Sequence, residues 1–177
     1  LHFGAHPVQT PGDYCDVLVT MNPAALRANA CWLRKGATVI IDGDTLDEKS
    51  VARAGFTTGD PFAELGIEDY NIIVADITTM TKEALAGLDL DVKSKNMFAL
   101  GMCLFMFNKP LEHAVEYINN KFGKRNPVVA EANVLALKAG HNYAHNTHAF
   151  ANTYDVQPAD LPKGRYRSIN GNQATAW

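Results

Sequence analysis

The run DVLVTMNP occupies residues 16–23 and combines the pattern of a buried strand with that of a helix start. Residues 16–21 are mostly apolar and β-branched, which predicts a strand. Asn22-Pro23 follows at once and is typical of an N-cap with proline at the first helical position. The helix predicted over residues 24–34 should end at Lys35-Gly36, where a cation meets the helix dipole and glycine permits a left-handed cap.

A second apolar strand is predicted just beyond this helix. Residues 37–42 read ATVIID, and residues 70–77 hold a third predicted strand centred on NIIVA. Because the first two strands are apolar along their whole length and joined by a helix, we expect them to be parallel neighbours in a sheet covered on both faces. Residues 43–69 contain several glycines and Pro61, which indicates irregular connections.

The second half of the chain has mainly helical patterns. An apolar run at 97–107 predicts a buried helix, and apolar residues at helical spacing over 111–122, stopped by Gly123, predict another. Asn126-Pro127 again resembles a cap plus proline and starts a third predicted helix. The expected fold is therefore α/β: a Rossmann-like, mostly parallel sheet with helices on both faces and a helical C-terminal half.

Composition near the C-terminus indicates a boundary. Residues 149–167 are rich in proline and polar residues, which is typical of a linker. Residues 168–177 resemble the beginning of a new helix. The expected organisation is one α/β domain over 1–148, a linker over 149–167, and the start of a further domain over 168–177.

Composition also limits the partners. The 177 residues are 47% apolar, and 16 basic residues against 19 acidic ones give a net charge of -3, which offers no electrostatic argument for binding nucleic acid or an anionic membrane. The apolar run at 97–107 falls short of the ~20 residues that cross a bilayer. Leu1–His6 has neither the basic start nor the apolar core of a signal peptide. Three widely spaced cysteines favour reduced thiols and a cytoplasmic setting.

Phosphate-binding motifs are the first chemistry tested. The sequence has no G-x-G-x-x-G and no Walker pattern. Asp42 ends a predicted parallel strand, the place of ribose-binding acids, but Gly43-Asp44 after it equally fits an ordinary turn. Without the glycine motif, the turn is the favoured interpretation.

Histidines and cysteines are the other candidates. His141, His145 and His148 have the spacing i, i+4 and i+7, which could present three imidazoles to zinc on one helix face. A polar helix end is the favoured alternative, because no acid stands nearby to orient an imidazole and histidine is favourable at a helix C-terminus. Cys103 lies in the apolar run and Cys15 beside an acid, so both thiols should be unreactive. No catalytic residue and no metal ligand are predicted.

Three blocks in order carry a family resemblance: DVLVTMNPAAL at 16–26, NMFALG at 96–101 and GRYRSINGN at 164–172. Together they resemble the 2-oxoacid:ferredoxin oxidoreductases. Residues 1–146 resemble the gamma-type domain and residues 164–177 the opening of the alpha domain. The parent therefore resembles a gamma-alpha fused subunit, as in the 2-oxoglutarate enzymes.

The resemblance implies a function. Such enzymes oxidatively decarboxylate a 2-oxoacid with thiamine diphosphate and Mg, pass electrons through an iron-sulfur cluster to ferredoxin, and release an acyl-coenzyme A. The family pattern places a strand and glycine-rich turn before Leu1, the substrate-contacting motif after Trp177, and most cofactor contacts in a beta subunit. We therefore expect an accessory domain without its own thiamine diphosphate or cluster, and with an unknown cofactor contact. Two alternatives remain: a stand-alone nucleotide-binding module, or a dimerisation domain with the 97–107 helix at its interface.

Overall fold

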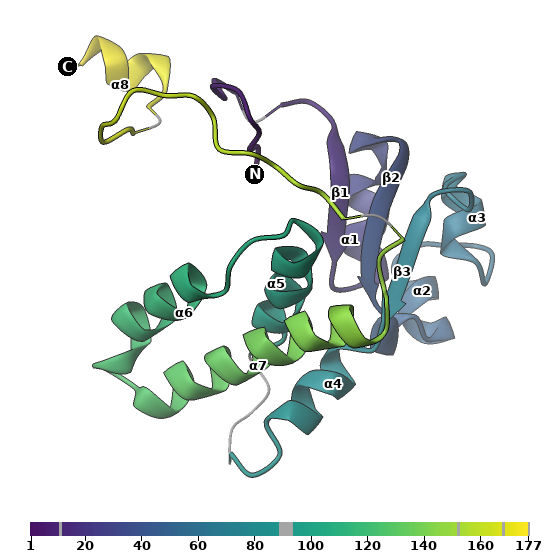
Figure 1. The fold of residues 1–177 in the computed structure, drawn as a ribbon. Helices are drawn as coiled ribbons and strands as arrows, with labels where there is room; N and C mark the ends of the chain where they lie inside the picture. Colours follow the sequence, from purple (N-terminus) through teal and green to yellow (C-terminus); the bar gives the residue numbers. More distant parts are fainter. Residues whose placement is uncertain (11, 89–93, 152, 168, 177) are drawn as a thin grey trace. The chain divides into compact units, whose positions relative to one another are not determined.

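The computed structural model describes residues 1–177 except 11, 89–93, 152, 168 and 177. The chain divides into two units, which are described separately (Figure 1). The larger unit runs from Tyr14 to Tyr154 and contains the sheet. The smaller one combines Leu1–Asp13 with Asp155–Trp177.

Three parallel strands form the sheet of the larger unit. They are β1 (Cys15–Thr20), β2 (Leu33–Asp42) and β3 (Asn71–Ala75), in the order β1-β2-β3. Thr20 pairs with Ile41 and Asp42 with Ala75, so the carboxyl ends of the three strands meet at one edge. The prediction of a parallel sheet is confirmed.

The connection between β1 and β2 differs from the prediction at its end. Helix α1 covers Pro23–Asn29, with Asn22 accepting a hydrogen bond from the amide of Ala25 at 2.8 Å. A 3-10 turn over Ala30–Trp32 follows, and β2 already begins at Leu33. The predicted helix to residue 34 is therefore wrong, because Leu33 is buried and pairs with Cys15, and strand pairing overrides helix propensity.

Lys35-Gly36, predicted as a helix stop, lies inside β2. Gly36 has φ +75° and falls where the β1–β2 register shifts, between the Cys15–Leu33 and Val17–Thr38 pairs. Gly36 does adopt the left-handed conformation, but it lies at an irregularity within a strand and not at a helix end. The sequence signal for αL backbone was correct and its assignment to a helix end was not.

The segment between β2 and β3 is more ordered than predicted. After a 3-10 turn over Gly43–Thr45 it forms α2 (Glu48–Arg53) and α3 (Pro61–Leu65). Asp47 and Asp60 cap these helices: the Asp47 carboxylate accepts from the amide of Ser50, and the Asp60 carboxylate from the amides of Phe62 and Ala63. The expectation of irregular connections is wrong here, because helices of one or two turns show too little periodicity to be recognised.

Helices make up the rest of the unit. They are α4 (Ile77–Ala84), α5 (Lys95–Met106), α6 (Glu112–Ile118) with a π-helical turn (Asn119–Gly123), and α7 (Pro127–Asn146). The three predicted helices correspond to α5, to α6 with its turn, and to α7. Helix α4 was not predicted, and Ile77, assigned to a strand by its sequence, begins it.

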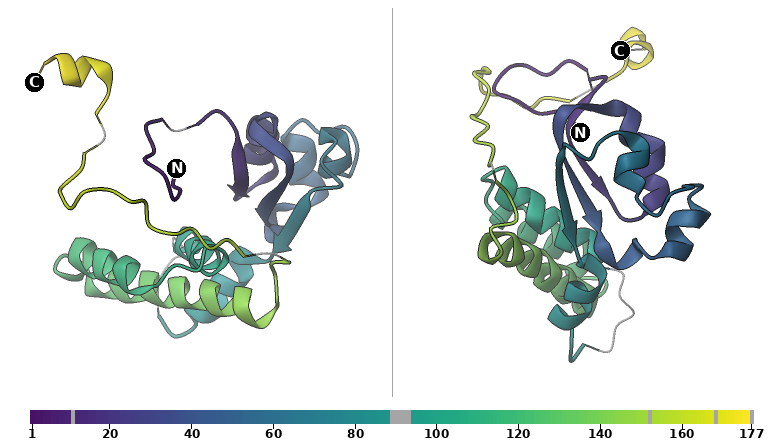
Figure 2. Two further views of the ribbon diagram at one scale, coloured as in Figure 1. Left: turned by 45° about the horizontal axis from the view of Figure 1, so that its top comes forward. Right: turned by 90° about the vertical axis from the view of Figure 1, so that its right-hand side faces the viewer.

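The two faces of the sheet carry separate hydrophobic cores, and helices lie on both faces (Figure 2). One face packs on α1 and α3 through Leu26, Ile41 and Ile67. The other packs on α4, α5 and α7, where Ile40 meets Phe98, among others. Because neighbouring residues of β2 point to opposite faces, the continuous apolar run of this strand supplies both cores. The expected helices on both faces are present.

The closest helix crossing in the unit joins α5 and α7. A Cβ added at Gly140 would lie 1.9 Å from the carbonyl oxygen of Phe98, and one added at Gly101 would lie 2.0 Å from that of Leu137. The two glycines therefore let the two backbones touch. This contact brings α5 and α7 together as one layer over the sheet (Figure 1).

The smaller unit contains one short helix, α8 (Gly171–Thr175). Asn170 and Gln173 form a capping box at its start, each side chain binding the backbone amide of the other. The helix expected within 168–177 is thus present. Among the described residues, no helix is long and apolar enough to cross a membrane.

Candidate functional site

The carboxyl end of β2 is the first place to look for a site, because ligands of open parallel sheets bind at this edge. Asp42, the last residue of β2, is fully buried. Its carboxylate accepts hydrogen bonds from the backbone amide of Thr78 at 3.2 Å and from the Thr78 hydroxyl at 2.6 Å. Lys95 of α5 completes the set, with Nζ 3.4 Å from Oδ2 of Asp42.

Asp44 repeats this arrangement one residue along α4. It accepts from the amide of Thr79 at 2.8 Å and from the Thr79 hydroxyl at 2.5 Å. Desolvation raises the pKa of the Asp44 carboxyl, but the hydrogen bonds from Thr79 together outweigh it and lower that pKa below its ordinary value. The first turn of α4 is therefore capped by carboxylates from β2 and its turn, while Asp76 at the N-cap position makes no capping bond through its side chain.

This geometry decides between the two interpretations of Asp42. A carboxylate with three donors and no exposed surface has no room for a ribose hydroxyl. Gly43 is equally crowded, since a Cβ there would lie 2.6 Å from Oδ1 of Asp76. The turn interpretation fits: Asp42 fastens α4 and α5 to the sheet.

The end of α7 divides the three histidines whose spacing had left zinc binding as the less favoured interpretation. His141 and His145 lie in the helix, whereas His148 lies beyond it with φ +47°. Both helical imidazoles meet the ring of Phe105 edge-on, with centroids 5.4 and 5.7 Å apart. Among the described residues, no three histidine, cysteine or acidic side chains are placed to hold a metal ion.

One surface hollow near these histidines was not predicted. It has a volume of about 430 Å³ and is lined by Leu104, Phe105, Asn108, Lys109, His141 and Thr153. Its residues come from the end of α5, from α7 and from the segment after α7. No sequence motif marks such a hollow, because it depends on how that last segment folds back over α5.

The three cysteines differ in environment. Burial raises the pKa of the Cys103 thiol to about 11. The pKa of the Cys15 thiol is raised mainly by burial and secondly by the negative charge of Asp16. Cys31 is exposed. The unreactive character of Cys103 and Cys15 stays a prediction, and among the described residues the three cysteines belong to no cluster of potential metal-binding side chains.

We expect thiol reagents to discriminate among these cysteines. At pH 8 a thiol of pKa near 11 is about 0.1% ionised, and Cys103 is also partly shielded from solvent, so Cys103 should react at least about a hundredfold more slowly than the exposed Cys31. Mass spectrometry after timed alkylation measures the three rates, and 6 M guanidinium should make them equal. Equal rates in the folded chain would contradict the partly buried position of Cys103 and the raised pKa of its thiol.

Comparison with known proteins places this α/β unit in a class of oxidoreductases. The chain belongs to the pyruvate ferredoxin/flavodoxin oxidoreductase family, whose sequence profile matches residues 1–143. It is 43% identical over 176 residues to the 2-oxoglutarate oxidoreductase subunit KorA of Mycobacterium tuberculosis. That alignment covers 97% of this chain and 27% of KorA, so the chain spans about a quarter of the length of this curated relative.

A solved structure supports the fold. The chain is similar to the 2-oxoglutarate:ferredoxin oxidoreductase of Magnetococcus marinus, solved with 2-oxoglutarate, coenzyme A and succinyl-CoA bound. The TM-score is 0.64 at 23% identity, over 89% of this chain and 24% of that one. At this identity the similarity to the solved structure concerns the fold alone. The family resemblance predicted from the sequence is confirmed by the match to the family profile.

Proposed function

We propose that this chain is the accessory domain of a 2-oxoacid:ferredoxin oxidoreductase, with 2-oxoglutarate as its 2-oxoacid and an acyl-coenzyme A as its product. The observation that carries the proposal is 43% identity along 97% of the chain to a subunit named for 2-oxoglutarate oxidation. The partners are then a beta subunit, ferredoxin and coenzyme A.

The described residues support a positioning role. Enzymes of this kind need thiamine diphosphate with Mg and an iron-sulfur cluster, but the cysteines here are dispersed and the carboxylates at the sheet edge are engaged by Thr78, Thr79 and Lys95. These side chains do not fit either group. The domain acts by shape: it holds the neighbouring parts of the enzyme in register, and positioning alone can govern turnover.

The assay uses the full-length subunit assembled with its partner subunit, with reduction of ferredoxin followed in the presence of 2-oxoglutarate and coenzyme A. We expect turnover with 2-oxoglutarate and less than about a tenth of that rate with pyruvate. His141→Ala and Cys103→Ala should each keep the rate within about tenfold, because loss of a true acid, base or nucleophile typically costs 10²-fold or more.

Cofactor content and assembly are measured for every variant, so that a poorly assembled complex is not mistaken for lost chemistry. No turnover with any 2-oxoacid would contradict the proposed activity. A hundredfold loss in His141→Ala, in a fully assembled and loaded complex, would instead contradict the positioning role and make His141 a catalytic candidate.

A further inference from the structure

Helix α7 has one exposed side, on which an acidic, an apolar and a basic residue follow one another along the helix. Its other sides are buried against α5, α4 and α6, as the buried residues Ala136, Leu137 and Gly140 show. The exposed side carries Glu131, Leu135 and Lys138, with Leu135 38% exposed. Val128, 46% exposed, extends the same side by two turns from Leu135.

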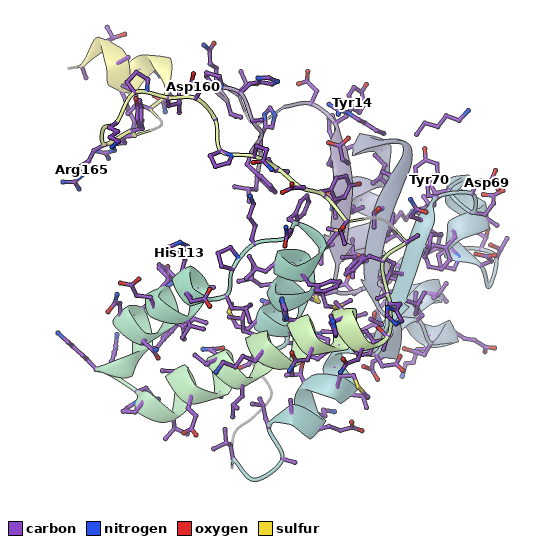
Figure 3. The ribbon with its side chains drawn as sticks, viewed as in Figure 1. Tyr14, Asp69, Tyr70, His113, Asp160 and Arg165 are labelled. Atoms are coloured by element: carbon purple, nitrogen blue, oxygen red, sulfur yellow. The ribbon has the colours of Figure 1, made fainter. Side chains whose placement is uncertain are left out.

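This side borders a shallow hollow of about 450 Å³ between α7 and the segment made of α6 and its π-helical turn. Val115 of α6 and Gly123 of the π-helical turn form one wall, and Glu131, Leu135 and Lys138 form the other. In Figure 3, His113 lies on the side of α6 away from α7, so it does not enter this hollow. The surface therefore offers an apolar centre with one acid and one base beside it.

Neither charged group has an ion-pair partner among the described residues of its own copy. Arg34 pairs with Asp16 and Lys95 pairs with Asp42, whereas Glu131 and Lys138 take part in neither of these pairs. Seven residues separate Glu131 from Lys138, about 10 Å along the axis at 1.5 Å per residue, which is too far for the two to pair on one helix.

The order of charges is self-complementary in an antiparallel arrangement. Glu131 lies four residues before Leu135, and Lys138 three residues after it. When two α7 helices run antiparallel with Leu135 on the two-fold axis, Glu131 of one copy is level with position 139 of the other. Lys138 of that copy is then only about 1.5 Å away along the axis.

The positions of Glu131 and Lys138 around the helix axis also fit the antiparallel pair. Residues seven apart lie on the same flank of a helix, and a two-fold axis between antiparallel helices brings equal flanks together. Each copy then contributes its Glu131 to one ion pair and its Lys138 to the other, with the two Leu135 side chains between them. A parallel two-fold pair would instead leave Glu131 of one copy about 10 Å along the axis from Lys138 of the other, so neither ion pair could form.

We propose that this exposed side of α7, centred on Leu135, binds a second copy of the same chain in an antiparallel, two-fold symmetric pair. The inference goes beyond the proposed enzyme function, because it depends only on the residues of α7 and α6. It also differs from the dimer predicted from residues 97–107, since that helix is α5, whose Phe98, Met102 and Met106 are buried within one copy.

The expected strength is modest. Because the surface is one helix side and the rim of a shallow hollow, we expect it to bury less than the ~1,200 Å² of a standard interface and to associate weakly, with a Kd in the micromolar range. Analytical ultracentrifugation of the 177-residue chain between 1 and 500 µM covers this range. We expect the weight-average mass to rise from that of a monomer towards that of a dimer.

Charge reversal provides the decisive variants. Glu131→Lys alone places four cations in the pair and Lys138→Glu alone places four anions, so each should weaken self-association at least about tenfold. An equimolar mixture of the two single variants should associate like the unaltered chain, because every lysine again meets a carboxylate. The double variant E131K/K138E should do the same.

The matched control is Lys49→Glu, which reverses an exposed charge on α2. It should leave self-association unchanged, and circular dichroism should show the same fold for all variants. A chain that stays monomeric to 500 µM overturns the proposal. So does a mixture of the two single variants that fails to associate, or a loss of association in Lys49→Glu as large as in the α7 variants.

Discussion

Replacing Gly140 with alanine should destabilise the chain by about 3 kcal/mol or more, at the upper end of the usual cost of overpacking and a large part of the 5–15 kcal/mol that holds a typical domain folded. The added methyl would lie 1.9 Å from the carbonyl oxygen of Phe98 and 2.6 Å from its carbonyl carbon. These are backbone atoms of α5, so no side-chain rotation relieves the overlap. The helices must separate by more than 1 Å, which opens the core around Phe98 and Met102.

Chemical denaturation followed by far-UV circular dichroism measures the effect. Gly123→Ala is the matched control: it also replaces a glycine in a helical segment, but a Cβ there meets nothing within 4 Å. That variant should be unchanged or up to about 1 kcal/mol more stable. If Gly140→Ala and Gly123→Ala shift the midpoint equally, the close crossing of α5 and α7 is wrong.

Gly101 tests the same crossing from the other helix. Its Cβ would meet the carbonyl oxygen of Leu137 at 2.0 Å and the amide nitrogen of His141 at 2.8 Å. Gly101→Ala should therefore cost a similar amount. The double variant should cost less than the sum of the two, because helices already separated by one methyl accommodate the second.

The sequence predicted the elements whose patterns are long. Residues 16–21 and 37–42 were recognisable as buried parallel strands because β-branched runs on both sides of a helix leave few alternatives. Helix α7 was recognisable from Asn126-Pro127 and its apolar spacing. Helices α2 and α3 were not, although Asp47 and Asp60 stand before them as caps: a cap without a long periodic stretch behind it does not distinguish a short helix from a turn.

For the residues of the candidate site, the sequence left two interpretations open and could not select one. The sequence placed Asp42 at a strand end but could not show that Thr78 and Lys95, 36 and 53 residues away, would occupy its carboxylate. The three histidines had zinc spacing, and only the structure shows that the helix ends before His148. The glycines that matter most, Gly101 and Gly140, are 39 residues apart, and their contact depends on how two helices cross.

The second large effect on stability is expected from replacing Asp42. We expect Asp42→Ala to destabilise the chain by about 3–4 kcal/mol, since removing one partner of a buried charged network leaves the others unsatisfied. The amide and hydroxyl of Thr78 would lose their acceptor and Lys95 its counter-ion, at a residue with no exposed surface. Asp42→Asn should cost less, because the asparagine oxygen can still accept from Thr78.

Asp16→Ala is the control, because it removes a carboxylate from an ion pair that is exposed. The Arg34–Asp16 pair is shorter, at 2.9 Å against 3.4 Å, but both of its side chains are 60% exposed. An exposed pair contributes only about 0–1 kcal/mol, so Asp16→Ala should have little effect despite its better distance.

Burial, and not distance, should therefore decide which carboxylate matters. Hydrogen exchange locates the loss: the amides of Thr78 and Thr79 at the start of α4 should lose protection in Asp42→Ala and keep it in Asp16→Ala. Equal unfolding free energies for the two variants would mean that Asp42 does not fasten α4 to the sheet. Its buried carboxylate would then lack the structural role that explains its position at the end of β2.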